Sequence, residues 1–379
     1  MSSATIQTLR LSALERRLAD DVPFGAHDHI AANVSTAYVQ LLALIANEVR
    51  SARDILSLIS LNGEDDIRLV FRDPLTRRAI EDSVCKVVRN LGTIEPWTID
   101  MLLSGVAERI RSHQFTFLNE VVRCTPVASG RGYGYVLLDN EPSTPHGRWF
   151  ADEVLKRVPG LRLAAPTQAA IENLHRGTAF ADRISPRLTR SALSHNFAVV
   201  MGEFTDGNAF KSLTVPGLPG VMVLSPEVLG DHLQAAEALV HESFHLKFLD
   251  IDYFQHLFPV GFRPELSPRV TPVWHEGTRY GNWPVDRVLT SMHVYTALAV
   301  FFELAAQHST GDPGIDPARF AARAMQCADR AAWLLQKARE HSQSLTDSGR
   351  NFVEWIAQVL AGLADCRVPG SELASEAVY

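Results

Sequence analysis

Residues 238–247 read ALVHESFHLK, and this stretch decides how the middle of the chain is expected to fold. It holds two histidines, His241 and His245, four positions apart, with Glu242 directly after the first. Residues four apart lie on the same face of an α-helix, with Cβ atoms ~5–6 Å from each other, so both imidazoles can reach one ion. Glu242 projects about 100° round the helix, where it can reach a water beside the ion. The pattern predicts a helix over 231–257 that binds a divalent metal ion through His241 and His245.

The residues around the two histidines are apolar at helical spacing. Leu239, Val240, Phe244 and Phe248 place one side of the expected helix in a core. A neutral imidazole in a dry core needs a polar partner, and a cation supplies one for both rings. The alternative is a chance match of a short motif in a chain with 14 histidines.

A third ligand has to come from elsewhere, because a metal site open for catalysis takes three protein ligands. The extended pattern with a glycine and a further histidine is excluded, since Phe248 and Ile251 stand at those positions. His256 follows His245 by eleven residues, too far along the axis at ~1.5 Å per residue to share the ion. Downstream candidates remain open: His275, Glu276, His293 and Glu303.

Periodicity along the rest of the chain predicts further helices and three short strands. Apolar residues recur at helical spacing in five other stretches; these are 32–61 (one amphipathic helix or a bent pair), 74–89, 99–122, 284–307 and 317–363. Short apolar runs next to turn residues predict strands; these are 135–138, 196–201 and 220–224. We expect an α+β fold, mostly helical, with a small sheet next to a zincin-like metal helix.

The same pattern suggests three consecutive regions. These are a helical N-terminal region at 1–125, an α/β metal-binding catalytic core at 126–310, and a C-terminal helical region and tail at 311–379. The strand at 220–224 has two interpretations. At a sheet edge it could pair with an extended peptide, whereas its unbroken apolar sequence favours a buried core strand.

Composition and charge exclude several classes of partner. The chain has 379 residues and a net charge of -7, which argues against a protein whose main task is binding nucleic acid. Its four cysteines lack C-x-x-C spacing and are expected to be free thiols. The N-terminus has no secretory signal pattern. No uninterrupted apolar run reaches the ~18 residues of a membrane span. A cytoplasmic protein without a membrane partner is the expectation.

Four stretches resemble a known family, the 2-oxoglutarate-dependent H-E-x-x-H peptide β-hydroxylases that modify ribosomally made peptides. The likeness covers about residues 200 to 305. It lies in 212–214 together with 219–226, in 238–247, in the loop around Trp274, and in 284–289 followed by His293. The H-E-x-x-H run alone is unspecific, and its combination with the later arginine-to-histidine segment separates this family from peptidases.

The resemblance implies a cofactor set and a reaction. Fe(II) would be held by His241, His245 and His293, with Glu242 as a catalytic residue. Arg287 would bind the distal carboxylate of 2-oxoglutarate, which suits the planar, bidentate guanidinium. The substrate would be a ribosomal precursor peptide, hydroxylated on a side-chain β-carbon.

Two other functions remain open from the residues. A zinc metallopeptidase would use Glu242 as general base, with 277–281 forming part of a substrate cleft. A non-catalytic peptide-binding or scaffold protein would keep a vestigial metal site.

Overall fold

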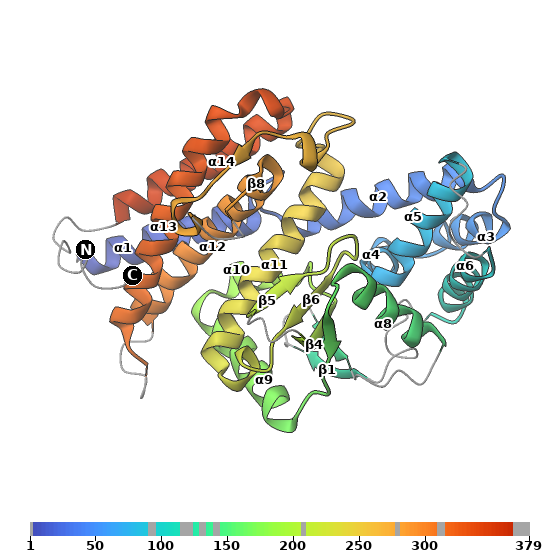
Figure 1. Ribbon diagram of the computed structural model, residues 1–379, viewed down its shortest axis with the longest axis horizontal. Helices are drawn as coiled ribbons and strands as arrows, with labels where there is room; N and C mark the ends of the chain where they lie inside the picture. Colours follow the sequence, from blue (N-terminus) through green and yellow to red (C-terminus); the bar gives the residue numbers. More distant parts are fainter. Residues whose placement is uncertain are drawn as a thin grey trace. The chain divides into compact units, whose positions relative to one another are not determined.

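The computed structural model describes residues 3–89, 96–113, 124–128, 134–138, 145–205, 210–276, 281–308 and 315–366 (Figure 1). The chain divides into two compact units that interleave along the sequence. The first unit comprises 1–25, 183–188 and 255–379, and the second comprises 26–182 and 189–254. The three consecutive regions expected from the sequence, 1–125, 126–310 and 311–379, stay a prediction.

The second unit contains a mixed sheet. Its strands are β1 (Cys124–Ala128), β2 (Gly134–Leu138), β3 (Leu161–Leu163), β4 (Ala198–Phe204), β5 (Ser212–Thr214) and β6 (Val221–Leu224). They are ordered β1-β2-β4-β6-β5, and β3 pairs with the far end of β4. Strands β2, β4 and β6 run parallel, while β1, β3 and β5 are antiparallel to their neighbours. The predicted α+β class, mostly helical with a small sheet, is confirmed, and β2, β4 and β6 are its three predicted strands.

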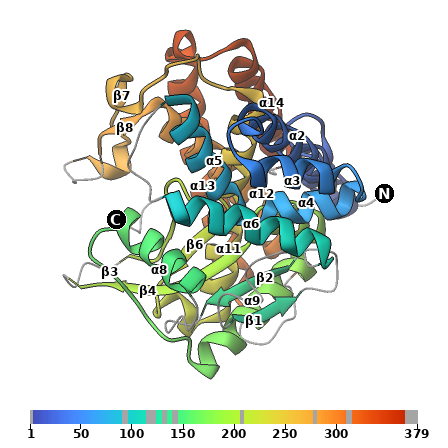
Figure 2. The ribbon, with the colours of Figure 1, turned by 90° about the vertical axis from the view of Figure 1, so that its right-hand side faces the viewer.

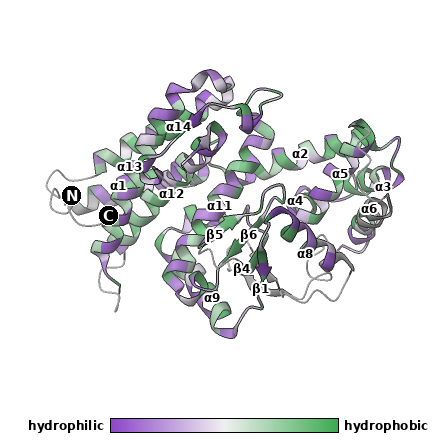
Figure 3. Cartoon of the chain, viewed as in Figure 1, coloured by the Kyte–Doolittle hydropathy of each residue, from purple (hydrophilic) through white to green (hydrophobic). Residues whose placement is uncertain are grey.

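Strands β4 and β6 form the centre of this sheet because they are apolar on both faces (Figure 3). Alternate residues of a strand share a face, so Val199 and Met201 of β4 lie beside Met222 and Leu224 of β6. These four pack into one core with Leu239, which lies just before the H-E-x-x-H run. Strand β6 is therefore internal, between β4 and β5, and the alternative of a peptide-pairing edge at 220–224 is wrong. The edge beside it is β5.

Helix α11 (His232–Gln255) carries the H-E-x-x-H run. It begins at Asp231, whose Oδ1 accepts hydrogen bonds from the backbone N–H groups of Leu233 at 3.0 Å and Gln234 at 2.8 Å. Such an N-cap stabilises a helix by about 1 kcal/mol. The helix ends before His256, whose φ of 50° is left-handed, as is common just past a C-terminus. The helix predicted over 231–257 is confirmed to within two residues at each end.

The second unit contains several other helices (Figure 2). They are α2 (His27–Ile45), α3 (Arg50–Ile59), α4 (Glu64–Arg72), α5 (Pro74–Arg89), α6 (Pro96–Arg111), α8 (Pro145–Arg157), most of α9 (Gln168–Ile184), the end of α10 (Pro186–Leu193) and a 3₁₀ turn at Val228–Gly230. The stretch 32–61 is the bent pair α2 and α3. The helix predicted over 99–122 ends earlier, at Arg111, and residues 114–122 lie outside the described part of the chain.

The first unit is built on helices. They are α1 (Ser3–Asp20), α12 (Val285–His308), α13 (Pro317–Glu340) and α14 (Asp347–Cys366), with 3₁₀ turns at Pro264–Leu266, Val273–His275 and Ser342–Ser344. A two-stranded ladder of β7 (Arg269–Val270) and β8 (Trp283–Pro284) precedes α12. Helix α12 packs against α1, α13 and α14. The helices predicted over 284–307 and 317–363 are confirmed, the second as two helices.

Two observations concern the expected thiols and membrane spans. Cys85, Cys327 and Cys366 are free thiols. Within the described ranges one helix, α12, is long and apolar enough to cross a bilayer, a candidate that the sequence analysis did not identify. Most of α12 is buried inside the protein, and a core helix meets the same criteria.

Gly177 sets how closely α9 packs on the start of α11. A Cβ at this position would lie 2.7 Å from the carbonyl oxygen of His232 and 2.9 Å from the backbone nitrogen of Ala236. Both contacts are with backbone, which cannot move aside as a flexible side chain can. The absence of a side chain at Gly177 therefore permits this helix contact.

We expect Gly177→Ala to destabilise the protein by about 1–3 kcal/mol, as overpacking does. Alanine in an unobstructed helix interior would instead be stabilising by ~1 kcal/mol, so the sign of the effect tests the contact. The measurement is urea or thermal unfolding. Gly63→Ala, at the N-cap of α4, is the control for adding a methyl group without a clash, because nothing lies within 4 Å of a Cβ there. An equal or stabilising effect at Gly177 would contradict the packing.

Candidate metal centre

The rings of His241 and His245 converge on the surface of α11. Their Nε2 atoms are 3.2 Å apart and their ring centroids 4.9 Å apart. Two nitrogen ligands, each ~2.1 Å from a single divalent ion, lie about 3 Å from one another. The pair therefore already has the spacing that one ion requires. Both rings are partly exposed, so an ion can reach them from solvent.

Glu242 lies beside this pair but is buried. Its Oε1 is 3.8 Å from Nε2 of His241 and accepts a hydrogen bond of 2.7 Å from the hydroxyl of Ser212. Burial raises the pKa of Glu242 to about 7, although hydrogen bonds from Ser212 and Thr214 favour its ionised form. Ser212 and Thr214 both belong to the edge strand β5. The carboxyl group is thus placed to take or give a proton near neutral pH.

His293, the third ligand implied by the resemblance, lies in α12 of the first unit, whereas the other two histidines lie in the second. It is fully buried, with its ring centroid 5.5 Å from that of Phe352 and 6.0 Å from that of Trp355 in α14. No group of three His, Cys, Asp or Glu side chains able to hold one ion occurs among the described residues. The role of His293 as a ligand stays a prediction.

Arg287, expected to bind the cosubstrate, lies exposed in the first turn of α12. Its guanidinium carbon is 4.6 Å from the ring centroid of Trp283, within the range of a cation–π interaction. The ring of His275 is 5.5 Å from the same tryptophan. Burial lowers the pKa of His275, with Arg287 and Arg330 adding to the effect. The structure places Arg287 in an aromatic cluster of the first unit. The loop 277–281, which a metallopeptidase would use in its substrate cleft, lies outside the described ranges except for Gly281.

Two charged residues of α11 that the sequence analysis did not single out are also buried. Lys247 donates a hydrogen bond of 2.7 Å to the hydroxyl of Ser191. The carboxylate of Asp250 forms hydrogen bonds of 2.7 Å with Nη1 of Arg77 and with Nδ1 of His195. Burial opposes the ionisation of Asp250, but these two partners outweigh it and lower its pKa to about 2. The sequence signal that could have identified Lys247 and Asp250 was the presence of ionisable residues in an otherwise apolar helix.

No protein-family model matches this sequence, and no curated protein matches it. The function of the chain therefore has to be inferred from its own residues and their geometry.

Replacing either histidine with alanine should weaken metal binding by ~100-fold or more, because even outer partners of a ligand contribute 10–100-fold. The measurement is calorimetric titration of the full chain with Zn²⁺, and with Fe(II) under anaerobic conditions. His256→Asn is the control, since His256 is exposed and asparagine tolerates its left-handed backbone. Wild-type metal affinity in both His241→Ala and His245→Ala would show that neither histidine is a metal ligand.

The raised pKa of Glu242 predicts how the metal-free protein responds to pH. Below pH ~4.5 the carboxyl is protonated in both states and has no effect. As pH rises from 4.5 to about 7 the unfolded state ionises first, so folding stability is lost over this window. The loss is at most on the order of 3 kcal/mol.

Glu242→Gln keeps an oxygen to accept from Ser212 but cannot ionise. The metal-free variant should therefore match the wild type near pH 4.5 and be more stable above pH 7, as measured by thermal unfolding across this range. Parallel profiles for the two proteins would show that Glu242 is not a buried group with a raised pKa.

Proposed function

We propose that this chain is a divalent-metal enzyme that hydroxylates a side-chain β-carbon of a ribosomally synthesised peptide, using Fe(II) and 2-oxoglutarate. The observation that carries the metal site is the 3.2 Å separation of the Nε2 atoms of His241 and His245. Imidazole nitrogens suit both iron and zinc, so this donor pair fits either ion. The choice of iron follows from the resemblance of residues 200–305 to the peptide β-hydroxylases.

In this proposal each residue has a defined role. His241 and His245 would hold the ion, with His293 as the third ligand that the resemblance implies, and Arg287 would pair with the remote carboxylate of 2-oxoglutarate through its planar guanidinium. Bound Fe(II) supplies the oxygen chemistry. One atom of O₂ enters the peptide C–H bond as hydroxyl, and the other enters succinate as CO₂ leaves. Glu242, with a pKa of about 7, holds or moves a proton beside the ion.

The sheet offers a means of holding a peptide next to the two histidines. Among the described strands, β5 ends the sheet, so its outer backbone groups have no neighbouring strand within it. An extended peptide can add to such an edge through main-chain hydrogen bonds. The side chain of Ser212 in β5 contacts Glu242 directly. A zincin-like arrangement, with metal helix and peptide-binding edge strand side by side, is part of the proposal.

Glu242 also favours a second candidate, a zinc metallopeptidase. A buried carboxylate with a pKa near 7 suits a general base that deprotonates an attacking water. The same edge strand would then align the peptide for cleavage rather than for hydroxylation.

The two candidates are separated by spectroscopy and product analysis. Anaerobic addition of Fe(II) and 2-oxoglutarate to the full chain should give a weak visible charge-transfer band. With a peptide and O₂, each turnover should add the mass of one oxygen atom and release one succinate. Peptide cleaved with zinc and without 2-oxoglutarate would overturn the hydroxylase and support the peptidase. Metal binding without turnover of any peptide would support a scaffold protein.

Variants of the first unit test the two remaining assignments. Arg287→Lys should weaken 2-oxoglutarate binding by about 1–3 kcal/mol, because lysine lacks the matching fork, while leaving metal affinity unchanged. Arg263→Lys, also exposed, is the control. His293→Ala should lower iron affinity. Unchanged iron binding in this variant would show that His293 is not the third ligand, and His275 would be the next candidate to test.

A further inference from the structure

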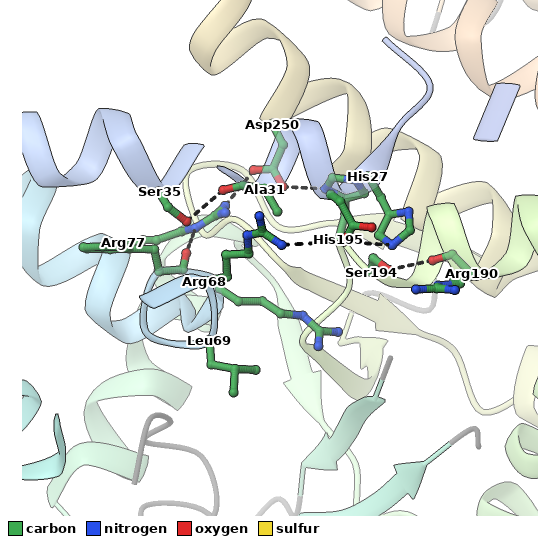
Figure 4. A pocket seen from close by; sticks show the side chains of 13 residues that line it. His27, Ala31, Ser35, Arg68, Leu69, Arg77, Arg190, Ser194, His195 and Asp250 are labelled. Atoms are coloured by element: carbon green, nitrogen blue, oxygen red, sulfur yellow. Dashed lines mark hydrogen bonds and ion pairs between the residues drawn. The ribbon is translucent and has the colours of Figure 1, made fainter. Parts of the chain in front are cut away.

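A cavity of about 260 Å³ lies in the second unit, apart from the histidine pair (Figure 4). Basic side chains from four parts of the chain line it. They are His27 from α2, Arg68 and Arg72 from α4, Arg77 from α5, and Arg190 and His195 from α10 and the segment after it. The volume is somewhat below the ~300–1,000 Å³ of pockets for drug-sized ligands. The cavity therefore suits a small molecule.

Two carboxylates, Asp28 and Asp250, line the cavity, and Glu64 outside the lining pairs with Arg68 at 3.4 Å, so three carboxylates face four guanidinium groups. Asp250 lies between Arg77 and His195 and pairs with both (Figure 4). The side chain of Asp28 is 67% exposed, which leaves it largely in solvent, 3.4 Å from His27 and 4.0 Å from Arg68. Counting formal charges alone, the lining carries more positive than negative charge.

Arg72 shows the effect of this imbalance. Its guanidinium donates to the main-chain carbonyl oxygens of Leu193 at 3.3 Å and Asn196 at 2.6 Å, which are neutral acceptors. Burial lowers the pKa of Arg72 to about 10, and Arg77 lowers it further than Asp250 can offset. An additional negative charge in the cavity would stabilise this cation.

We infer that the cavity binds a small oxyanion, a carboxylate or a phosphate, through the guanidinium groups of Arg68, Arg72 and Arg190. Planar guanidinium groups bind both kinds of oxyanion with paired, charge-assisted hydrogen bonds. The inference does not depend on the proposed function, because the cavity is lined by residues of the second unit other than His241, Glu242 and His245. The lining residue of the cavity that shares a helix with His245 is Asp250, which lies five residues later and ~7.5 Å further along α11.

The experiment uses the metal-free full chain and two probes, inorganic phosphate and succinate, with chloride at equal ionic strength as the reference. We expect saturable binding by calorimetry and a raised melting temperature with at least one probe. The stronger probe identifies the class of anion. His241→Ala should bind it as the wild type does, which keeps this site distinct from the metal centre. Binding of neither probe would overturn the inference.

Arg190→Gln is the variant of choice, because Arg190 is exposed at the lining and its loss should leave the fold intact. It should weaken binding by about tenfold, the effect of one charged hydrogen bond. Arg187→Gln, three residues earlier on α10 and outside the lining, is the matched control. Arg68→Gln is a second lining variant in case Arg190 contributes to folding. Equal affinity in the two lining variants and the control would also overturn the inference.

Discussion

The buried carboxylate of Asp250 joins three segments of the second unit. Helix α11 carries it, α5 meets it through Arg77, and the segment before β4 meets it through His195. Removing a carboxylate from water costs several kcal/mol, so a helix can bring one into a core only where a cation, here Arg77, meets it. Breaking such a pair from one side typically costs about 3–5 kcal/mol. These contacts, together with the packing of Leu239 into the core, constrain the rotation of α11 about its own axis and so the direction in which His241 and His245 point.

The burial that holds α11 against the sheet also sets the chemistry of its carboxyl group. Leu239 packs into the core with β4 and β6, and Glu242 is drawn out of water on the same helix. Its pKa rises because the charged form loses hydration, and the hydroxyl of Ser212 compensates only in part. The packing of Leu239 and the raised proton affinity of Glu242 therefore both follow from the position of α11 against the sheet. The partly exposed histidine pair beside Glu242 stays open to an ion from solvent.

Local patterns explain which elements were predictable. Apolar periodicity over many residues predicts long helices such as α11 and α12, and short apolar runs predict strands such as β4 and β6. Strand β5, by contrast, has only three residues, Ser212 to Thr214, with a single apolar side chain. Such a segment becomes a strand because β6 offers it a hydrogen-bonding edge. The same reason explains why the sequence left two interpretations of 220–224, a sheet edge and the favoured buried core strand: an edge is defined by the strands that pair and not by the strand itself.

The sequence by itself determined the helix at 231–257 and the convergence of His241 and His245, because the geometry of residues four apart is a local property of any α-helix. It also indicated the α+β class. Only the tertiary structure decided the surroundings of Glu242 and the cluster around Asp250. Those contacts join residues far apart in the chain, 30 positions for Ser212 and Glu242 and 173 for Arg77 and Asp250. No local period encodes such pairs, so their burial, charge balance and raised or lowered pKa values follow only from the folded chain.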